Sequence, residues 1–230
     1  MQLVLEDVHV QGRRGPLLQL DGLTVETGEA VLVAGEPGQG HTALSLVLSG
    51  RLAPAAGRVG LVHDDGTVTV DRAALRRVSA IVDLPAVSEP DDAVPVATVV
   101  AEDLAQARRP LRPGTTGSWL ADLGTGLEGN ERMDELPGIL RTSVLTALAA
   151  EAPTVRFLLL ALPDRHWGEP VQWWGLARSY AAAGYGVLVQ CTRSSARDLG
   201  ATLAPARRTT PLVALRARPD HPHADEEDQP

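Results

Sequence analysis

The sequence predicts an α/β domain with a mostly parallel sheet, an N-terminal antiparallel β part and a reduced helical subdomain. Three short, almost fully apolar runs of strand length lie far apart in the chain, and segments of helical periodicity separate them. Strands of a parallel sheet are covered by helices on both faces, so their sequences are continuously apolar. We therefore expect residues 31–34, 157–160 and 187–190 to be neighbouring buried strands of one sheet.

The composition limits the class of protein. The chain has 230 residues and a formal net charge of −8, and all 21 of its basic residues are arginine. An acidic chain without a basic stripe argues against nucleic-acid binding. Its single cysteine, Cys191, excludes an internal disulfide and suits a reducing cytoplasm.

The ends of the chain and its hydropathy bear on location. No segment contains the roughly 20 apolar residues needed to span a bilayer. The start, with Glu6 and Asp7, does not have the pattern of a signal peptide. We expect a soluble cytoplasmic chain that reaches a membrane only through a partner. Residues 1–218 form the predicted domain, and the acidic, proline-containing residues 219–230 are expected to be a disordered tail.

The first elements are predicted from alternation and turn residues. Apolar and polar residues alternate over 1–10, which indicates a strand with one solvated face. A glycine-rich turn at 12–16 leads into a second strand over 18–25. Further along, Asp65-Gly66 lies between two short apolar runs, which is typical of a hairpin.

The buried strand that ends at Ala34 is followed by a glycine-rich turn and a short helix. Glycines and a hydroxyl stand at the spacing of a phosphate-binding loop, G-x-x-x-x-G-K-[ST]. Such a loop binds phosphate mainly through backbone N–H groups and the helix N-terminus. The candidate nucleotide-binding residues are Gly35, Glu36, Pro37, Gly38, Gln39, Gly40, His41, Thr42 and Ala43, and the Thr42 hydroxyl is the candidate Mg²⁺ ligand.

One residue of this loop departs from the pattern, because His41 stands where the lysine is expected. A nearby phosphate would favour the charged form of a histidine, so His41 could partly replace the lysine. Alternatively, His41 has no role in binding. The whole segment could also be a strand–turn–helix junction without a ligand.

The remaining elements follow from periodicity and caps. Asp71 is placed to cap a short helix, and Gly50 and Gly184 are placed to end the helices before them. The helical subdomain is expected over approximately 96–152. Helices are predicted over 42–49, 71–77, 96–108, 119–123, 136–152 and 171–183, and further strands over 78–82 and 187–191.

This order of elements resembles the nucleotide-binding domain of ATP-binding cassette (ABC) proteins, which is a P-loop NTPase fold. The segments that carry the resemblance are residues 20–25, Thr27-Gly28-Glu29, the phosphate loop, residues 52–59 and residues 75–82. The resemblance implies ATP and Mg²⁺ as cofactors. It also implies a membrane permease subunit or a second ABC ATPase subunit as partner, a dimer, and a place at the inner face of the cell membrane.

Every catalytic motif of the family is altered. The family's Q-loop glutamine corresponds to Asp83, and the acidic pair of its Walker B strand corresponds to Ala161-Leu162. Leu136-Pro137-Gly138-Ile139-Leu140 stands for the signature L-S-G-G-Q, Thr192 or Cys191 for the switch histidine, and Gln11 and Gly12 for the aromatic residue that stacks on adenine.

These losses predict a poor enzyme. Alkyl side chains at 161 and 162 have neither lone pairs nor a titratable proton. Loss of a general base alone typically costs about 10²–10⁴-fold in rate. No catalytic residue is therefore assigned. The sequence predicts a degenerate ATP-binding subunit of an ABC transporter-like system. The alternatives are a nucleotide-independent scaffold or regulatory protein with this fold, and an active ATPase completed by a partner subunit.

Three tryptophans gather around one loop and the start of one helix. Trp167, Trp173 and Trp174 could form a partner surface, because aromatic residues are enriched at interface hot spots. Packing into the core explains them equally well.

Overall fold

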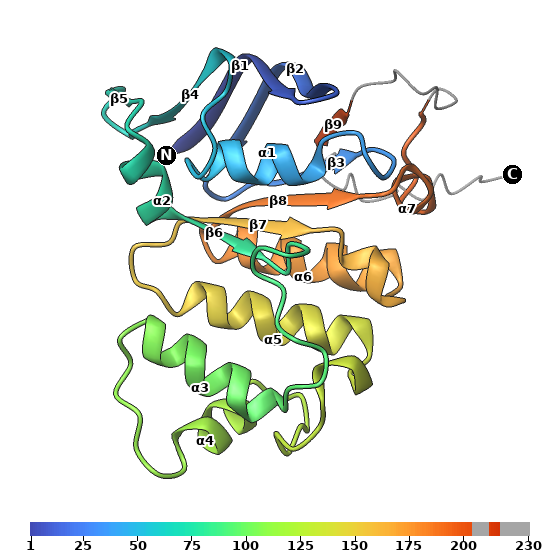
Figure 1. The fold of residues 1–230 in the computed structure, drawn as a ribbon. Coiled ribbons are helices and arrows are strands. Elements are labelled where there is room, and N and C mark those ends of the chain that lie inside the picture. Colours follow the sequence, from blue (N-terminus) through green and yellow to red (C-terminus); the bar gives the residue numbers. More distant parts are fainter. Residues whose placement is uncertain (204–211, 217–230) are drawn as a thin grey trace, which may run out of the picture.

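The computed structural model describes residues 1–203 and 212–216, and it contains two sheets (Figure 1). The N-terminal sheet is antiparallel, with the strand order β2-β1-β4-β5. The second sheet has the order β6-β7-β8-β3-β9, in which all strands but β9 run parallel. The strands are β1 (Gln2–Gly12), β2 (Gly15–Glu26), β3 (Ala30–Ala34), β4 (Ala56–Val62), β5 (Val68–Thr69), β6 (Ser79–Val82), β7 (Phe157–Ala161), β8 (Gly186–Cys191) and β9 (Val213–Arg216).

The helices cover both faces of the second sheet. Helix α1 lies between the two sheets, α5 and α6 lie on the opposite face, and α3 and α4 lie beyond α5 (Figure 1). The helices are α1 (His41–Leu48), α2 (Arg72–Val78), α3 (Val96–Gln106), α4 (Thr115–Asp122), α5 (Gly138–Ala150), α6 (Pro170–Ala182) and α7 (Arg193–Asp198), with 3-10 turns η1 (Met133–Glu135) and η2 (Pro163–His166).

The three apolar runs form strands β3, β7 and β8, which are neighbours and buried along their whole length. Successive side chains of a strand point to opposite faces of the sheet. Leu158 and Leu160 accordingly join the cluster under α5 and α6, whereas Leu159 joins the cluster between the sheets. The predicted fold class, with its antiparallel N-terminal part, is confirmed.

Most local predictions are confirmed with small shifts of boundary. The Asp71 carboxylate caps α2 by accepting hydrogen bonds from the N–H groups of Ala73 and Ala74, both at 3.1 Å. Gly50 and Gly184 have positive φ after their helices. The short helix α7 was not predicted, because it is polar; Thr192 caps it by accepting a hydrogen bond from the Ser195 N–H.

The helical part of the molecule comprises α3, α4, η1 and α5, within the predicted range 96–152. None of the helices in the described residues has the length and apolar character to cross a membrane. The predicted tail, 219–230, and the predicted domain end at residue 218 lie outside the described residues.

Candidate functional site

The glycine-rich loop connects β3 to α1 at the carboxyl end of the second sheet, as predicted. Gly38 and Gly40 have φ of 86° and 103°, which other residues rarely adopt. A Cβ at Gly40 would also lie 2.5 Å from the Leu17 carbonyl oxygen. The sequence therefore forms the predicted strand–turn–helix junction, with glycine at the two positions of positive φ.

Side chains of the chain itself occupy part of this loop. The Gln39 side-chain oxygen accepts a hydrogen bond of 2.7 Å from the Glu36 N–H. Leu212, which is buried, lies so close to Gly35 that a Cβ there would be 2.2 Å from its Cδ2 atom. The N–H groups of Gly35 and Gln39 donate to the carbonyl oxygens of Cys191 and Glu36, both at 3.0 Å, so at least three loop N–H groups are already paired. An apolar side chain covers the Gly35 end of the loop.

His41 points into the protein, where it is only 5% exposed. Its Nδ1 lies 3.2 Å from the Gln190 side-chain oxygen, and the Gln190 amide donates to the Ser45 hydroxyl. Because that oxygen is an acceptor, Nδ1 carries the proton of neutral His41. Nε2 then presents a lone pair beside Gly35, where it makes no hydrogen bond of good geometry to the described residues.

Burial lowers the pKa of His41, and the contacts with the Gly35 backbone and the Gln190 side chain only partly offset this effect. The neutral form is therefore favoured at neutral pH. A lysine at this position would offer an anion a fixed charge, whereas neutral His41 offers a lone pair that repels phosphate oxygens.

The end of β7 supplies no metal ligand. Ala161 is buried, and Leu162 has φ of 52° and donates its N–H to the Gln190 carbonyl oxygen at 2.9 Å. Thr42, the predicted Mg²⁺ ligand, is exposed at the start of α1. The side chains at 161 and 162 are thus packing residues of a strand end.

Asp164 is the first carboxylate after β7, and the sequence interpretation gave it no role. Its Oδ2 accepts hydrogen bonds of 2.8 Å from the Thr192 N–H and from the Ser195 hydroxyl. Its Oδ1 is buried without a partner among the described residues. Asp164 therefore fastens the turn between β8 and α7. The capping residues Thr192 and Ser195 were the available signal for this contact, but they lie about 30 residues away in the sequence.

Asp83, at the Q-loop position, lies at the end of β6 in a network of charges and is 6% exposed. Its carboxylate accepts hydrogen bonds from Arg141 Nε at 3.1 Å and Nη2 at 3.2 Å. Arg165 Nη2 lies 3.0 Å from Oδ1, and His166 Nε2 lies 2.9 Å from Oδ2.

Burial opposes ionisation of Asp83, but the hydrogen bonds from His166 and Arg141 and the charges of Arg141 and Arg165 outweigh it. They lower the pKa of Asp83 to about 2. Its charged form therefore stabilises the fold fully above the unfolded-state pKa, and this stabilisation is lost as the pH falls towards 2.

The start of α5 contains the segment predicted in place of the signature. Gly138 packs so closely on η2 that a Cβ would lie 2.1 Å from the His166 carbonyl oxygen. Leu136 is buried, and Ile139 and Leu140 are half-buried. The segment is thus apolar and packed against its own chain.

Comparisons with known proteins show which fold this is. No family model matches the chain. A stretch of 80 residues is 41% identical to the hemin import ATP-binding protein HmuV of Bradyrhizobium diazoefficiens, and it spans 34% of this chain and 30% of that protein. The structure resembles cbiO1 of Clostridium perfringens, part of the ABC transporter complex cbiONQ, with a TM-score of 0.59 and 17% identity over 83% of this chain and 77% of that one.

A nucleotide-free ATP-binding cassette from an ABC transporter gives a TM-score of 0.62 at 17% identity, over 84% of this chain and 82% of that one. This chain has the fold of an ABC-type ATPase domain. The family resemblance predicted from the sequence is thereby confirmed. The identity to these structures is low, so they establish the fold alone.

The ABC-type fold implies ATP and Mg²⁺ as cofactors. The residues present suit a nucleotide phosphate in part and do not suit Mg²⁺. The loop keeps glycines at its two positions of positive φ, between β3 and α1. However, Gln39 takes one of its N–H groups, and His41 turns a lone pair towards it. Magnesium does not fit, because the exposed Thr42 hydroxyl faces no carboxylate at 161 or 162.

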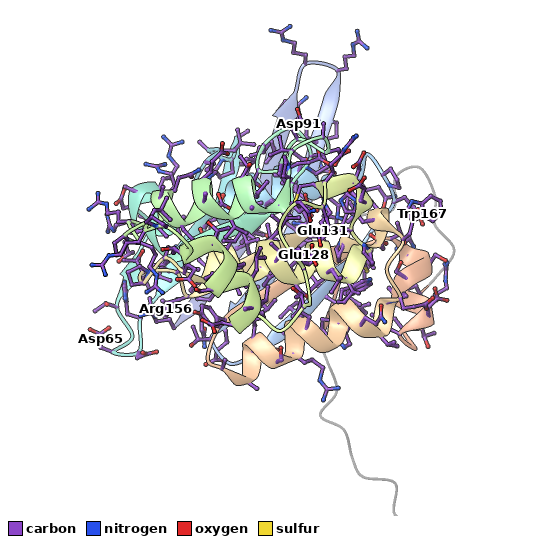
Figure 2. The ribbon with its side chains drawn as sticks, turned by 90° about the horizontal axis from the view of Figure 1, so that it is seen from below. Asp65, Asp91, Glu128, Glu131, Arg156 and Trp167 are labelled. Carbon is purple, nitrogen blue, oxygen red and sulfur yellow. The ribbon has the colours of Figure 1, made fainter. Side chains whose placement is uncertain are left out.

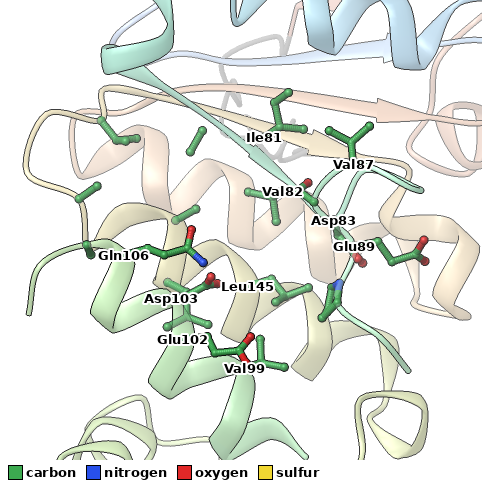
Figure 3. A pocket seen from close by; sticks show the side chains of 18 of the residues that line it. Ile81, Val82, Asp83, Val87, Glu89, Val99, Glu102, Asp103, Gln106 and Leu145 are labelled. Carbon is green, nitrogen blue, oxygen red and sulfur yellow. The ribbon is translucent and has the colours of Figure 1, made fainter. Parts of the chain in front are cut away.

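The ABC-type domain also contains a groove of about 670 Å³ between the sheet and its helical part (Figure 3). Its floor includes apolar residues of β6 and α5, such as Val82, Leu145 and Leu148. One wall, formed by α2 and by Arg51 after α1, is basic, and the α3 wall is acidic. The charged residues of these two walls are Arg51, Arg76, Arg77, Glu102 and Asp103, and the loop between β6 and α3 adds Asp83, Glu89 and Asp91.

The clustered tryptophans of the sequence differ in how far they are buried. Trp173 belongs to α6 and is buried in the core, with 1% of its surface exposed. Trp167 is 98% exposed and projects from the edge of the molecule (Figure 2). Trp174 is half-buried and packs against the same core cluster. Trp173 is therefore a core residue, and Trp167 is the most exposed of the three.

Proposed function

We propose that this chain is a degenerate ATP-binding subunit of an ABC transporter-like system, which binds ATP weakly and hydrolyses it poorly or not at all. The observation that carries this proposal is the pair of alkyl side chains at the end of β7, the buried Ala161 and the half-buried Leu162, in a fold that keeps the glycine-rich turn between β3 and α1. Its partner is a membrane permease subunit or a second ABC ATPase subunit. That partner places the chain at the cytoplasmic face of the membrane.

The groove supports a partner that supplies an α-helix. Apolar floors between two elements accept amphipathic helices. Arg51 and Arg76 are close enough for their charges to lower the pKa of Arg51 further than burial does alone, so an acidic group between them is favoured. The occupant is expected to turn acidic residues towards α2 and basic residues towards α3.

A second candidate is a nucleotide-independent scaffold with the same fold. The contacts inside the phosphate loop favour it, because Gln39 and Leu212 close the cradle without a ligand. Calorimetric titration with ATP, with and without Mg²⁺, separates the two candidates. Weak heat of binding that is insensitive to Mg²⁺ supports the degenerate subunit. No binding at any accessible concentration supports the scaffold.

If ATP binds, its affinity is expected to increase as the pH falls. Contact with phosphate raises the pKa of His41 above its lowered value in the free protein. The affinity therefore gains up to about tenfold per pH unit between the bound-state and free-state pKa values, and it levels off below the latter. The measurement is calorimetric titration across a pH series.

The matched control is His41→Gln, which keeps a polar side chain next to Gln190 but removes the titration. ATP also titrates in this range, so the quantity of interest is the difference in slope between the two proteins. Parallel pH profiles would show that His41 does not contact the phosphate.

A further inference from the structure

The loop between β6 and α3, residues 83–95, connects the sheet to the helical part, and Asp83 and Glu89 line the groove (Figure 3). Such a connection decides whether the two groove walls can move relative to each other. Its bonds can be followed from its first residue to its last.

The first residue of the loop is held by a buried ion pair. The Asp83 carboxylate accepts hydrogen bonds from both Nε and Nη2 of Arg141, which is in α5 and is 1% exposed. A two-point contact of this kind fixes orientation as well as distance. The end of β6 is thereby joined to the middle of the helical part.

The middle of the loop is held by Arg141 and by Arg165, the second arginine that contacts Asp83. Arg141 Nη1 donates to Asp92 Oδ1 at 2.9 Å and to the Met133 carbonyl oxygen at 3.2 Å. Arg165 Nη2, from η2, lies 2.9 Å from Glu89 Oε1. Three segments distant in sequence therefore meet at Asp83.

The last residues of the loop are held by backbone hydrogen bonds to the segment around η1. Met133 donates its N–H to the Val94 oxygen at 3.1 Å, and Val96 donates to the Glu131 oxygen at 2.9 Å. The loop has thus no long unbonded stretch in which a hinge could act.

We propose that the Asp83–Arg141 pair is a latch that holds the helical part in one orientation on the sheet and presets the groove width without nucleotide. The family resemblance places the Q-loop glutamine at position 83, where this chain has Asp83. In this chain, Asp83 accepts hydrogen bonds from Arg141 in the helical part of the same molecule. The consequence for docking, that a partner helix finds the groove ready in the absence of ATP, rests on the proposed function.

A metal ion is not needed to explain this cluster. One ligand atom each from Asp83, Glu89 and His166 lies within 4.8 Å of the others. However, Arg165 Nη2 already lies about equally close to both carboxylates, at 3.0 and 2.9 Å. The guanidinium groups supply the positive charge that a cation would bring.

The latch can be tested on the full chain by pulsed electron–electron distance measurement between spin labels on the two sides of the groove. Arg72→Cys in α2 and Ala105→Cys in α3 provide exposed attachment points, and the native Cys191 is buried. We expect one narrow distance distribution that MgATP does not change. Adding Arg141→Gln is expected to broaden the distribution and to lower the melting temperature by about 10 °C, because one partner of a buried ion pair is lost.

The matched control is Arg132→Gln, which removes a half-exposed ion pair with Asp134 in the same part of the molecule. It should leave the distance distribution unchanged. A narrow, unshifted distribution in Arg141→Gln would overturn the proposal, as would a shift of the wild-type distribution on addition of MgATP.

If Arg141→Gln does not fold, Asp92→Asn provides the second variant. The Asp92 side chain is 61% exposed and contributes only the Arg141 Nη1 contact, so the fold should survive its loss. We expect partial broadening and faster hydrogen exchange over 84–95, and unchanged exchange there would contradict the latch. The comparison of Arg141→Gln with wild type and the hydrogen-exchange rates are both measured without ATP, so the latch and the proposed function can fail independently.

Discussion

The purified chain is expected to release no phosphate from ATP above background, with or without Mg²⁺. Ala161 and Leu162 can neither hold a metal ion nor accept a proton, and the loss of a positioned base alone costs about 10²–10⁴-fold. The loss of electrostatic stabilisation at the transferred phosphate costs a comparable factor. The factors do not simply multiply, because residues that act as a unit are non-additive. Steady-state phosphate release measures the result.

Restoring the two carboxylates should not restore turnover. Ala161→Asp with Leu162→Glu leaves Asp83 bound to Arg141, and it leaves Leu136 to Leu140 apolar. In an ABC dimer, as the resemblance implies, each site pairs one subunit's phosphate loop with the signature of the other. This chain would therefore impair its own site and that of a partner.

The opposite outcome would identify an active enzyme. If wild-type turnover is measurable and Thr42→Ala abolishes it, the prediction is wrong. Asp164 would then be the candidate for a displaced acidic residue, because its Oδ1 is buried near His41 without a partner among the described residues. Asp164→Asn would test that assignment. The asparagine side chain would still offer an oxygen that can accept hydrogen bonds from the Thr192 N–H and the Ser195 hydroxyl.

The second large effect concerns stability. Trp173→Ala is expected to lower the free energy of unfolding by about 3–5 kcal/mol, because a large, fully buried side chain leaves a cavity under α6. Trp167→Ala, six residues earlier, is expected to change it by no more than about 0.5 kcal/mol, because Trp167 is 98% exposed. Urea unfolding of both variants measures the difference.

Trp173→Phe serves as the conservative control. It keeps most of the buried volume and removes an indole N–H that has no hydrogen-bond partner among the described residues. It should therefore recover most of the lost stability. Equal destabilisation by Trp167→Ala and Trp173→Ala would contradict the assignment of one tryptophan to the core and one to the surface.

The sequence by itself determined the sheet and the chemical deficits. Residues of β3, β7 and β8 are almost all apolar, and short apolar runs between helical segments favour strands that are covered on both faces. The alkyl side chains at 161 and 162 lack ligand atoms in any conformation. Similarly, the Asp71 cap and the turn at Gly66 depend on neighbours within a few residues, so local rules were sufficient to predict them.

Tertiary structure alone decided where the polar side chains point. His41 could be exposed or buried, and it is buried with Nδ1 against the side-chain oxygen of Gln190, 149 residues away, which accepts its hydrogen bond, and with Nε2 beside Gly35. Trp167 and Trp173 have the same side chain, yet packing buries one and exposes the other. The Asp83–Arg141 pair joins residues 58 apart that no periodicity relates. Periodicity reports which face of an element is buried, whereas pairing across elements depends on how those elements pack together.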